Sequence, residues 1–206
     1  MATKARQSSN SAKSKQLPPR KPKNLTQRKR EYLTDAEVDR LIKATAKNGR
    51  YGLRDSTIIL MMFRHGLRVS ELTALRWEQI DLKKAFIHIR RIKNGVHSTH
   101  PLRGIELRFL RQLERSNPHS TYVFISERKA PLTNRSIHHI IAQAGKNARL
   151  PFTIHPHMLR HSTGFYLANH GHDTRAIQAY LGHTNINNTV LYTQLSPQRF
   201  KNFWID

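Results

Sequence analysis

Cysteine is absent from the 206 residues of this chain. Without thiols, the protein has no disulfide framework and no thiolate ligands for a structural zinc ion. Long apolar runs are absent too, since no stretch approaches the ~18 consecutive apolar residues of a membrane span. The first residues also lack the apolar centre of a signal peptide. We therefore expect a cytoplasmic protein without a membrane partner.

Acidic residues are scarce. The chain has 13 Asp and Glu against 36 Lys and Arg, a net charge of +23. A field of this strength attracts polyanions, because binding them releases their counterions. Nucleic acid is the leading partner, and an acidic membrane surface or a ribosomal role are the alternatives.

The basic charge is shared between two parts of the chain. Residues 1–30 contain ten Lys and Arg, no acid and almost no apolar residues. Such a segment cannot offset its ordering entropy, so we expect a disordered basic arm. It would serve either as a solubilising tail or as an arm that clings to DNA. Residues 31–206 keep 26 basic and 13 acidic residues, so the predicted folded domain is itself basic.

The pattern of residues 31–206 is mostly helical. Thr34 and Glu37 form a capping box, and Gly66 follows a mostly apolar stretch. The spacing of apolar residues changes from a helical to a strand pattern at "FIHI" (residues 86–89). Asn94-Gly95 is a hairpin signal before a second strand. Helices are expected at 34–49, 54–66, 68–80, 106–113, 133–147 and, in short pieces, after residue 151, and "TYVFISE" (121–127) is expected to be another strand. The predicted class is mainly α with a small antiparallel β-sheet (α+β).

The stretch "HPHMLRHSTGFYLANHG" (155–171) gathers four histidines and an arginine. His157 and His161 have a two-histidine metal spacing, but the stretch lacks the glutamate of a HExxH motif and the chain offers no obvious third ligand. His161 could instead be a buried, hydrogen-bonded histidine, or the whole stretch a solvated basic face. His157 and Arg160 share one helix face, which would suit an anion.

Two other places support the anion interpretation. In "HGLRVSEL", Arg68 stands at a helix junction and Glu71 follows it at a spacing that would orient the arginine or cap its helix. Tyr192 would ordinarily be a core residue. Its ordinary pKa is about 10, so it needs help to act as a nucleophile, and two arginines beside a phosphate would provide it.

These boxes, "GLRVSELTALRW", "HPHMLRH", "YLGHTN" and "TVLYT", together resemble the conserved boxes of the tyrosine recombinases, the phage-integrase and Xer-type family. The likeness spans nearly all of residues 31–206 and follows the family's order. It implies a tyrosine recombinase catalytic domain at 31–206, with no separate N-terminal core-binding domain.

The resemblance also implies roles for individual residues. Tyr192 resembles the nucleophile, and the supporting residues would be Glu71 and His161. The remaining catalytic positions would be Arg68, Lys93, His157, Arg160 and His183, with Lys93 on the hairpin beside Arg90 and Arg91. The reaction would be a transesterification that needs no metal and no cofactor.

The closest likeness is to the fimbrial phase-variation invertases of enteric bacteria, through "IKNG…HPL" and "LGHTNI…TVLYT". It implies inversion of a promoter-bearing segment between inverted repeats in double-stranded DNA of the nucleoid. It further implies a homotetramer on synapsed DNA, with possible accessory DNA-bending proteins. Phe200, Phe203 and Trp204 would dock on a neighbouring protomer or pack on their own core. Competing interpretations are a catalytically silent DNA-binding regulator on the same fold and a generic nucleic-acid-binding protein.

Overall fold

The computed structural model describes residues 30–47, 49–92, 95–194, 196 and 200. Helices dominate this part of the chain, and the strands form a three-stranded antiparallel sheet. The predicted fold class is therefore confirmed. None of the described helices is long and apolar enough to cross a bilayer.

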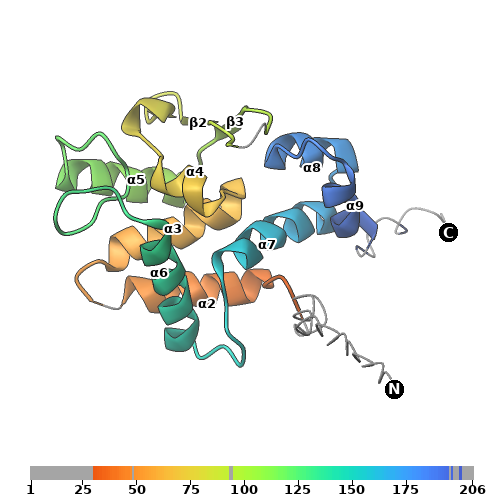
Figure 1. Cartoon of the computed structure of the whole chain (residues 1–206), viewed down its shortest axis with the longest axis horizontal. Coiled ribbons are helices and arrows are strands. Elements are labelled where there is room, and N and C mark those ends of the chain that lie inside the picture. The colour runs from red at the N-terminus through yellow and green to blue at the C-terminus, as the bar shows by residue number, and fades with distance from the viewer. Residues whose placement is uncertain (1–29, 48, 93–94, 195, 197–199, 201–206) are drawn as a thin grey trace, which may run out of the picture.

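The helices pack around α3 and α7 (Figure 1). α7 runs from the layer of α2 and α3 to the end of the molecule where α8 and α9 lie (Figure 1). The bounds are α2 Asp35–Ala46, α3 Gly52–His65, α4 Val69–Thr73, α5 Gly104–Ser116, α6 Asn134–Asn147, α7 Pro156–Asn169, α8 Thr174–Leu181 and α9 Asn187–Gln194, with a 3₁₀ turn at Trp77–Gln79.

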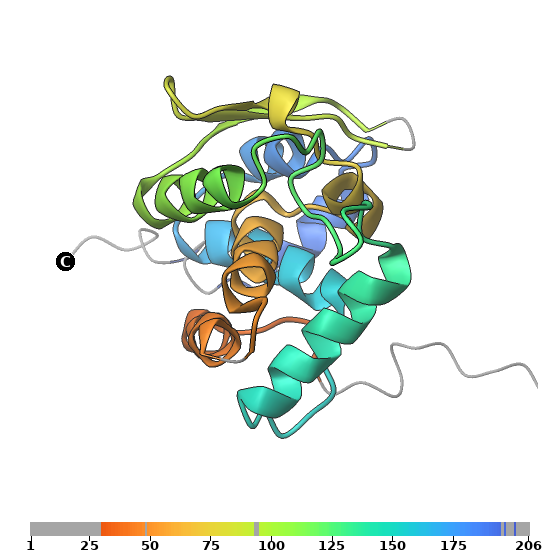
Figure 2. The same ribbon diagram turned by 90° about the vertical axis from the view of Figure 1, so that its left-hand side faces the viewer.

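The sheet consists of β1 (Ile80–Asp81), β2 (Phe86–Ile89) and β3 (Ser98–Pro101) in that order. β2 and β3 are antiparallel, with Ile87 opposite His100. Figure 2 shows this sheet along one side of the helices, with α2 on the far side. α8 contacts both β3 and α7, so this helix links the sheet to α7.

Helix ends follow the local chemistry that the sequence predicts. Glu37 Oε2 accepts a hydrogen bond from the Thr34 backbone N–H at 2.8 Å, which closes the predicted capping box of α2. α3 ends at Gly66, whose φ of 57° is in the left-handed region that glycine adopts without strain. A Cβ at residue 66 would also lie 2.4 Å from Leu181 Cδ2, so glycine lets the end of α3 approach the end of α8.

Two predicted elements are wrong. Residues 121–127 are not a strand, because only Tyr122 and Ile125 make isolated bridges and the chain turns back between Ser126 and Ala130. The predicted helix over 68–80 is cut short, since α4 ends at Thr73 and the chain continues into the 3₁₀ turn and β1. Val123, Phe124 and Ile125 are buried in succession, and burial alternates from Leu75 to Gln79, so neither segment keeps the pattern of the predicted element.

The main core surrounds α3, whose Ile58, Ile59, Met61 and Met62 are fully buried. A second, smaller cluster forms between α7, α8 and α9. Its members are Phe165, Ala168, Ile177, Leu181 and Tyr192. Tyr192 is therefore a core side chain as well as a candidate nucleophile.

Candidate active site

Arg160 joins α7 to the C-terminal ends of α3 and α8. Its side chain extends away from α7. Nη2 donates to the Leu181 carbonyl at 2.7 Å, and Nη1 donates to the Gly66 carbonyl. The side chain is fully buried. Burial and the neighbouring Arg68 and Arg91 lower the pKa of Arg160 to about 9, so the group remains a cation at neutral pH. This junction fixes a positive charge where α3, α7 and α8 meet.

Arg68 lies at the start of α4 and is held by Glu71. Glu71 Oε2 accepts from the Arg68 backbone N–H at 2.9 Å, and Oε1 accepts from Nη1 at 2.7 Å. The carboxylate thus both caps α4 and orients the guanidinium. Glu71 is buried, whereas the Arg68 side chain is 29% exposed. Arg68 can therefore present its other donors to an external anion.

Tyr192 is almost completely buried, with 2% of its surface exposed. Its ring meets Phe165 edge-on with centroids 5.2 Å apart, and a Cβ at residue 164 would lie 2.4 Å from the ring, so Gly164 makes room for it. The hydroxyl lies 2.9 Å from His161 Nδ1. Burial raises the pKa of Tyr192, and the charges of Arg160 and Arg68 oppose that rise.

His157 and His161 follow each other along α7, and their rings meet edge to face with centroids 4.6 Å apart. Burial, then His157 and Arg160, lower the pKa of His161 to about 4. His161 is therefore neutral at pH 7, and an unprotonated Nδ1 can accept the hydrogen bond of Tyr192. Within the described residues, no group of three or more His, Asp or Glu side chains could hold a metal ion.

His183 follows Gly182, which ends α8 in the left-handed conformation. Its Nδ1 lies 2.8 Å from Thr189 Oγ1 on α9, and Thr189 is fully buried. Burial and nearby cations, Arg160 first among them, lower the pKa of His183 to about 3. The ring stacks on that of Tyr192 with centroids 6.4 Å apart. The threonine fixes the imidazole orientation.

The structure brings five of the proposed catalytic residues into one electrostatic neighbourhood. The charges of Arg68 and Arg160 act to lower the pKa of Tyr192, against the effect of burial. Together with burial, which is the larger cause, they also lower the pKa values of His183 and His157. Lys93, the sixth, lies outside the described residues, as do Phe203 and Trp204. Phe200 is described and its side chain is exposed.

One charged residue at this site was missed by sequence reasoning. Arg91 follows β2, and its side chain is fully buried against Glu71. A signal was present, because burial alternates along the strand and Ile87, Ile89 and Arg91 all face inward. Period-two alternation continued by one more residue would have placed Arg91 on the inner face.

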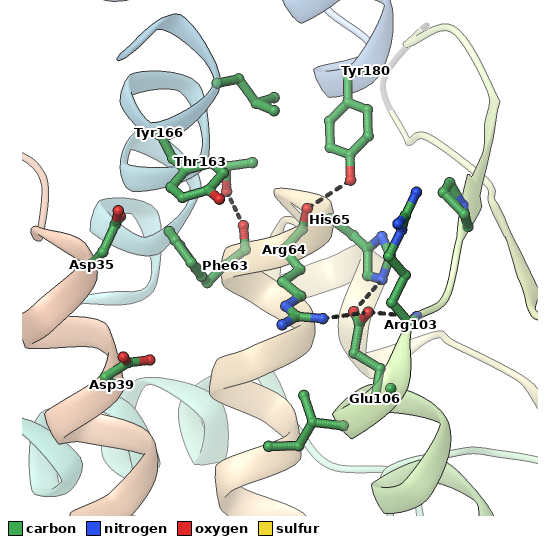
Figure 3. A pocket seen from close by; sticks show the side chains of 14 residues that line it. Asp35, Asp39, Phe63, Arg64, His65, Arg103, Glu106, Thr163, Tyr166 and Tyr180 are labelled. Carbon is green, nitrogen blue, oxygen red and sulfur yellow. Dashed lines mark hydrogen bonds and ion pairs between the residues drawn. The ribbon is translucent and has the colours of Figure 1, made fainter. Parts of the chain in front are cut away.

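A polar network supports the end of α3 (Figure 3). Glu106 lies 2.9 Å from both His65 Nε2 and Arg64 Nη1, and it accepts from the backbone N–H of Arg103 at 3.0 Å. Tyr180 donates to the Arg64 carbonyl at 2.8 Å. These groups line a cavity of about 610 Å³. The network fixes the turn whose Gly66 carbonyl holds Arg160.

The sequence matches the phage integrase family over residues 31–199. It is 46% identical to the type 1 fimbriae regulatory protein FimB of Escherichia coli (strain K12) over 86% of this chain and 90% of that one. It is 43% identical to FimE of the same strain over 85% and 91%. The tyrosine recombinase XerA of Pyrococcus furiosus is 34% identical over 82% of this chain and 59% of its own length.

Solved structures agree with the fold. The crystal structure of XerA recombinase superposes with a TM-score of 0.73 and 26% identity, over 90% of this chain and 65% of that one. XerH recombinase bound to a palindromic difH substrate gives a TM-score of 0.72 at 20% identity, over 84% and 52%. The chain therefore belongs to the phage integrase family, and it is a tyrosine recombinase, an enzyme of site-specific DNA recombination.

Proposed function

We propose that this recombinase inverts a promoter-bearing DNA segment bounded by inverted repeats, and so switches a neighbouring gene on and off. One observation carries the proposal: two type 1 fimbriae regulatory proteins are 46% and 43% identical to this chain over nearly their full length. A recombinase that regulates transcription does so most directly by moving a promoter. The protein would act on double-stranded DNA in the bacterial nucleoid.

Tyr192 is the proposed nucleophile. Its oxygen would attack the scissile phosphorus, forming a 3′-phosphotyrosine bond while the bond to the 5′-oxygen breaks. The phenol proton would leave through a histidine, and the neutral His161 already lies at hydrogen-bonding distance from the hydroxyl. His157, whose ring contacts His161, would bind a phosphate oxygen or pass that proton on.

The five-coordinate phosphorus carries extra negative charge. Arg68 and Arg160 would bind its oxygens, because forked guanidinium donors match phosphate geometry, and His183 would add a further hydrogen bond. Lys93 would protonate the leaving 5′-oxygen, in a segment outside the described residues. None of these steps calls for a metal or nucleotide cofactor.

The reaction conserves the energy of the phosphodiester in the protein–DNA bond, so a partner strand's 5′-hydroxyl can reverse it. Inversion would require four protomers on two synapsed sites and two rounds of strand exchange. The aromatic residues Phe200, Phe203 and Trp204 would link neighbouring protomers. The basic segment 1–30 would add affinity for the DNA backbone, and accessory DNA-bending proteins would bring the two sites together.

Covalent capture tests this proposal. Wild type and Tyr192→Phe are expressed in cells of the source organism, the lysate is denatured, and DNA attached to the captured protein is sequenced. The proposal predicts attached DNA at a pair of inverted repeats for the wild type only. Tight DNA binding without an adduct from either protein would instead support a catalytically silent DNA-binding regulator on the same fold.

A further inference from the structure

Arg91 is a buried arginine that ties four segments together. Its side chain has no exposed surface. Nη1 donates to Glu71 Oε2 at 2.8 Å, and Nη2 donates to the carbonyls of Tyr180 at 2.7 Å and His65 at 3.2 Å. The backbone N–H donates to His97 Nδ1 at 2.9 Å, which closes the hairpin behind it. The arginine thus joins the hairpin to α3, α4 and α8.

Two glycines leave the space that this side chain fills. A Cβ at residue 95 would lie 2.7 Å from Arg91 Cβ. A Cβ at residue 182 would lie 2.8 Å from Arg91 Cγ and 2.7 Å from the Val96 carbonyl. Gly182 directly precedes the proposed catalytic His183. The arginine is therefore packed against the active site and not merely near it.

The charges at this point form a chain of three groups. Glu71 has Arg68 on one carboxylate oxygen and Arg91 on the other. Burial acts to raise the pKa of Glu71, but Arg91 and Arg68 outweigh it and hold the pKa below its ordinary value. The carboxylate is therefore ionised at neutral pH, and the three groups together carry one net positive charge.

That net charge depends on Arg91. With Arg68 alone beside it, the buried carboxylate would cancel the arginine's charge at the place where a phosphate binds. With Arg91 present, one cation balances Glu71 and one remains. Arg68 is the more exposed of the two, so its charge is the one that an incoming phosphate meets.

We propose that Arg91 is a positioning residue that neutralises Glu71 and thereby leaves the charge of Arg68 available to the scissile phosphate. The inference rests on the proposed function of Arg68 at that phosphate. A merely structural role, in which Arg91 only pins the hairpin to α8, would not depend on the charge of Glu71.

A double-mutant cycle separates the two roles. Arg91→Met, Glu71→Gln and the double variant are compared for covalent adduct formation on a duplex that carries the site recovered by covalent capture. Arg91→Met is expected to slow adduct formation at least about tenfold in the wild-type background, and less than about threefold in the Glu71→Gln background, where the carboxylate charge is already gone. Equal losses in both backgrounds would overturn the proposal.

The control is Arg90→Met. Arg90 is the neighbouring arginine, its side chain is 68% exposed, and it pairs with the exposed Glu78 at 3.1 Å. The Arg90→Met variant should retain the wild-type rate of adduct formation. If Arg91→Met does not fold, the comparison of Glu71→Gln with the double variant still decides the matter, because a loss above about threefold there contradicts the charge role.

A second readout uses the substrate's own charge. A methylphosphonate at the scissile position lacks the phosphate's negative charge, so less positive charge is needed to stabilise its transition state. The Arg91→Met defect should shrink on this substrate, as should that of Arg68→Ala, and an undiminished defect would overturn the proposal. If the wild type forms no adduct on either duplex, the proposed function fails, and this inference fails with it.

Discussion

The hydroxyl oxygen of Tyr192 lies 2.9 Å from Nδ1 of His161, a histidine on a different helix. The contact joins α9 to α7 and holds the proposed nucleophile by its reactive atom. His161 is neutral at pH 7, since its pKa is lowered to about 4. The neutral imidazole can therefore accept the hydrogen bond of the hydroxyl and orient its oxygen, so the proposed chemistry depends on the position of the Tyr192 ring.

Gly164 sets that position. Gly164→Ala would place a Cβ 2.4 Å from the Tyr192 ring, which must then move away from α7. We expect adduct formation to fall at least about tenfold, equivalent to about 1.4 kcal/mol in the barrier, while DNA affinity stays unchanged. Asn169→Ala, at the exposed end of the same helix, is the control. If Gly164→Ala forms adducts as fast as wild type, the close approach of Gly164 to the Tyr192 ring has no role.

Thr189 orients His183. Thr189→Val keeps the buried volume but removes the oxygen that lies 2.8 Å from His183 Nδ1. The imidazole then loses its fixed orientation, and we expect single-turnover cleavage to slow by about tenfold. Thr189→Ser keeps the oxygen and should restore most of the rate. A serine variant as slow as the valine variant would point to packing instead.

Glu106 anchors the end of α3 through its contacts with His65 and Arg64 (Figure 3). Glu106→Gln removes the buried charge that His65 and Arg64 contact, so we expect a loss of about 1–3 kcal/mol in the free energy of unfolding, measured with urea. The matched control is Glu127→Gln, which breaks only the exposed pair with Arg50 and should cost less than about 0.5 kcal/mol. Equal losses would contradict an anchoring role.

Stability should fall as the pH falls below about 6.5. The pKa values of His100 and His183 are lowered to about 3, and that of His161 to about 4, from 6.5 in the unfolded chain. Between these limits the unfolded state binds protons that the folded state does not. Each histidine then contributes a loss of at most about 1.4 kcal/mol per pH unit.

The pH effect is checked by urea unfolding at pH 7 and pH 5. His100→Asn should lose less stability between these two values than wild type does, because one of the three groups is gone. His172→Asn, an exposed position, should lose as much as wild type. A wild-type protein equally stable at both pH values would be inconsistent with three histidines that stay neutral in the folded protein.

Much of the arrangement follows from local sequence. Thr34 with Glu37 predicts the start of α2, and Gly66 predicts the end of α3, because capping chemistry acts within a few residues. The resemblance of separated boxes identified Arg68, His157, Arg160, His183 and Tyr192, which the fold then brings into one neighbourhood. Spacing along the chain places only His157 and Arg160 on one helix face, and it contains no information on the proximity of the other three.

The errors arose where tertiary contacts overrule local pattern. Residues 121–127 have strand composition, yet they form a loop in which Val123, Phe124 and Ile125 are buried against the core. Arg91 was passed over because buried arginines are rare without a partner, and its partner Glu71 is twenty residues away in sequence. The histidine that contacts Tyr192 is likewise 31 residues from it.

The central claim is that Tyr192 is the nucleophile, and locating the covalent bond tests it most directly. Adducts of the wild-type protein with its recovered site are digested with nuclease and protease, and the peptide that carries the residual nucleotide is identified by mass spectrometry. The account predicts a 3′-linked nucleotide on Tyr192 and no adduct from Tyr192→Phe. A nucleotide on any other residue, or an adduct that persists in Tyr192→Phe, would contradict it.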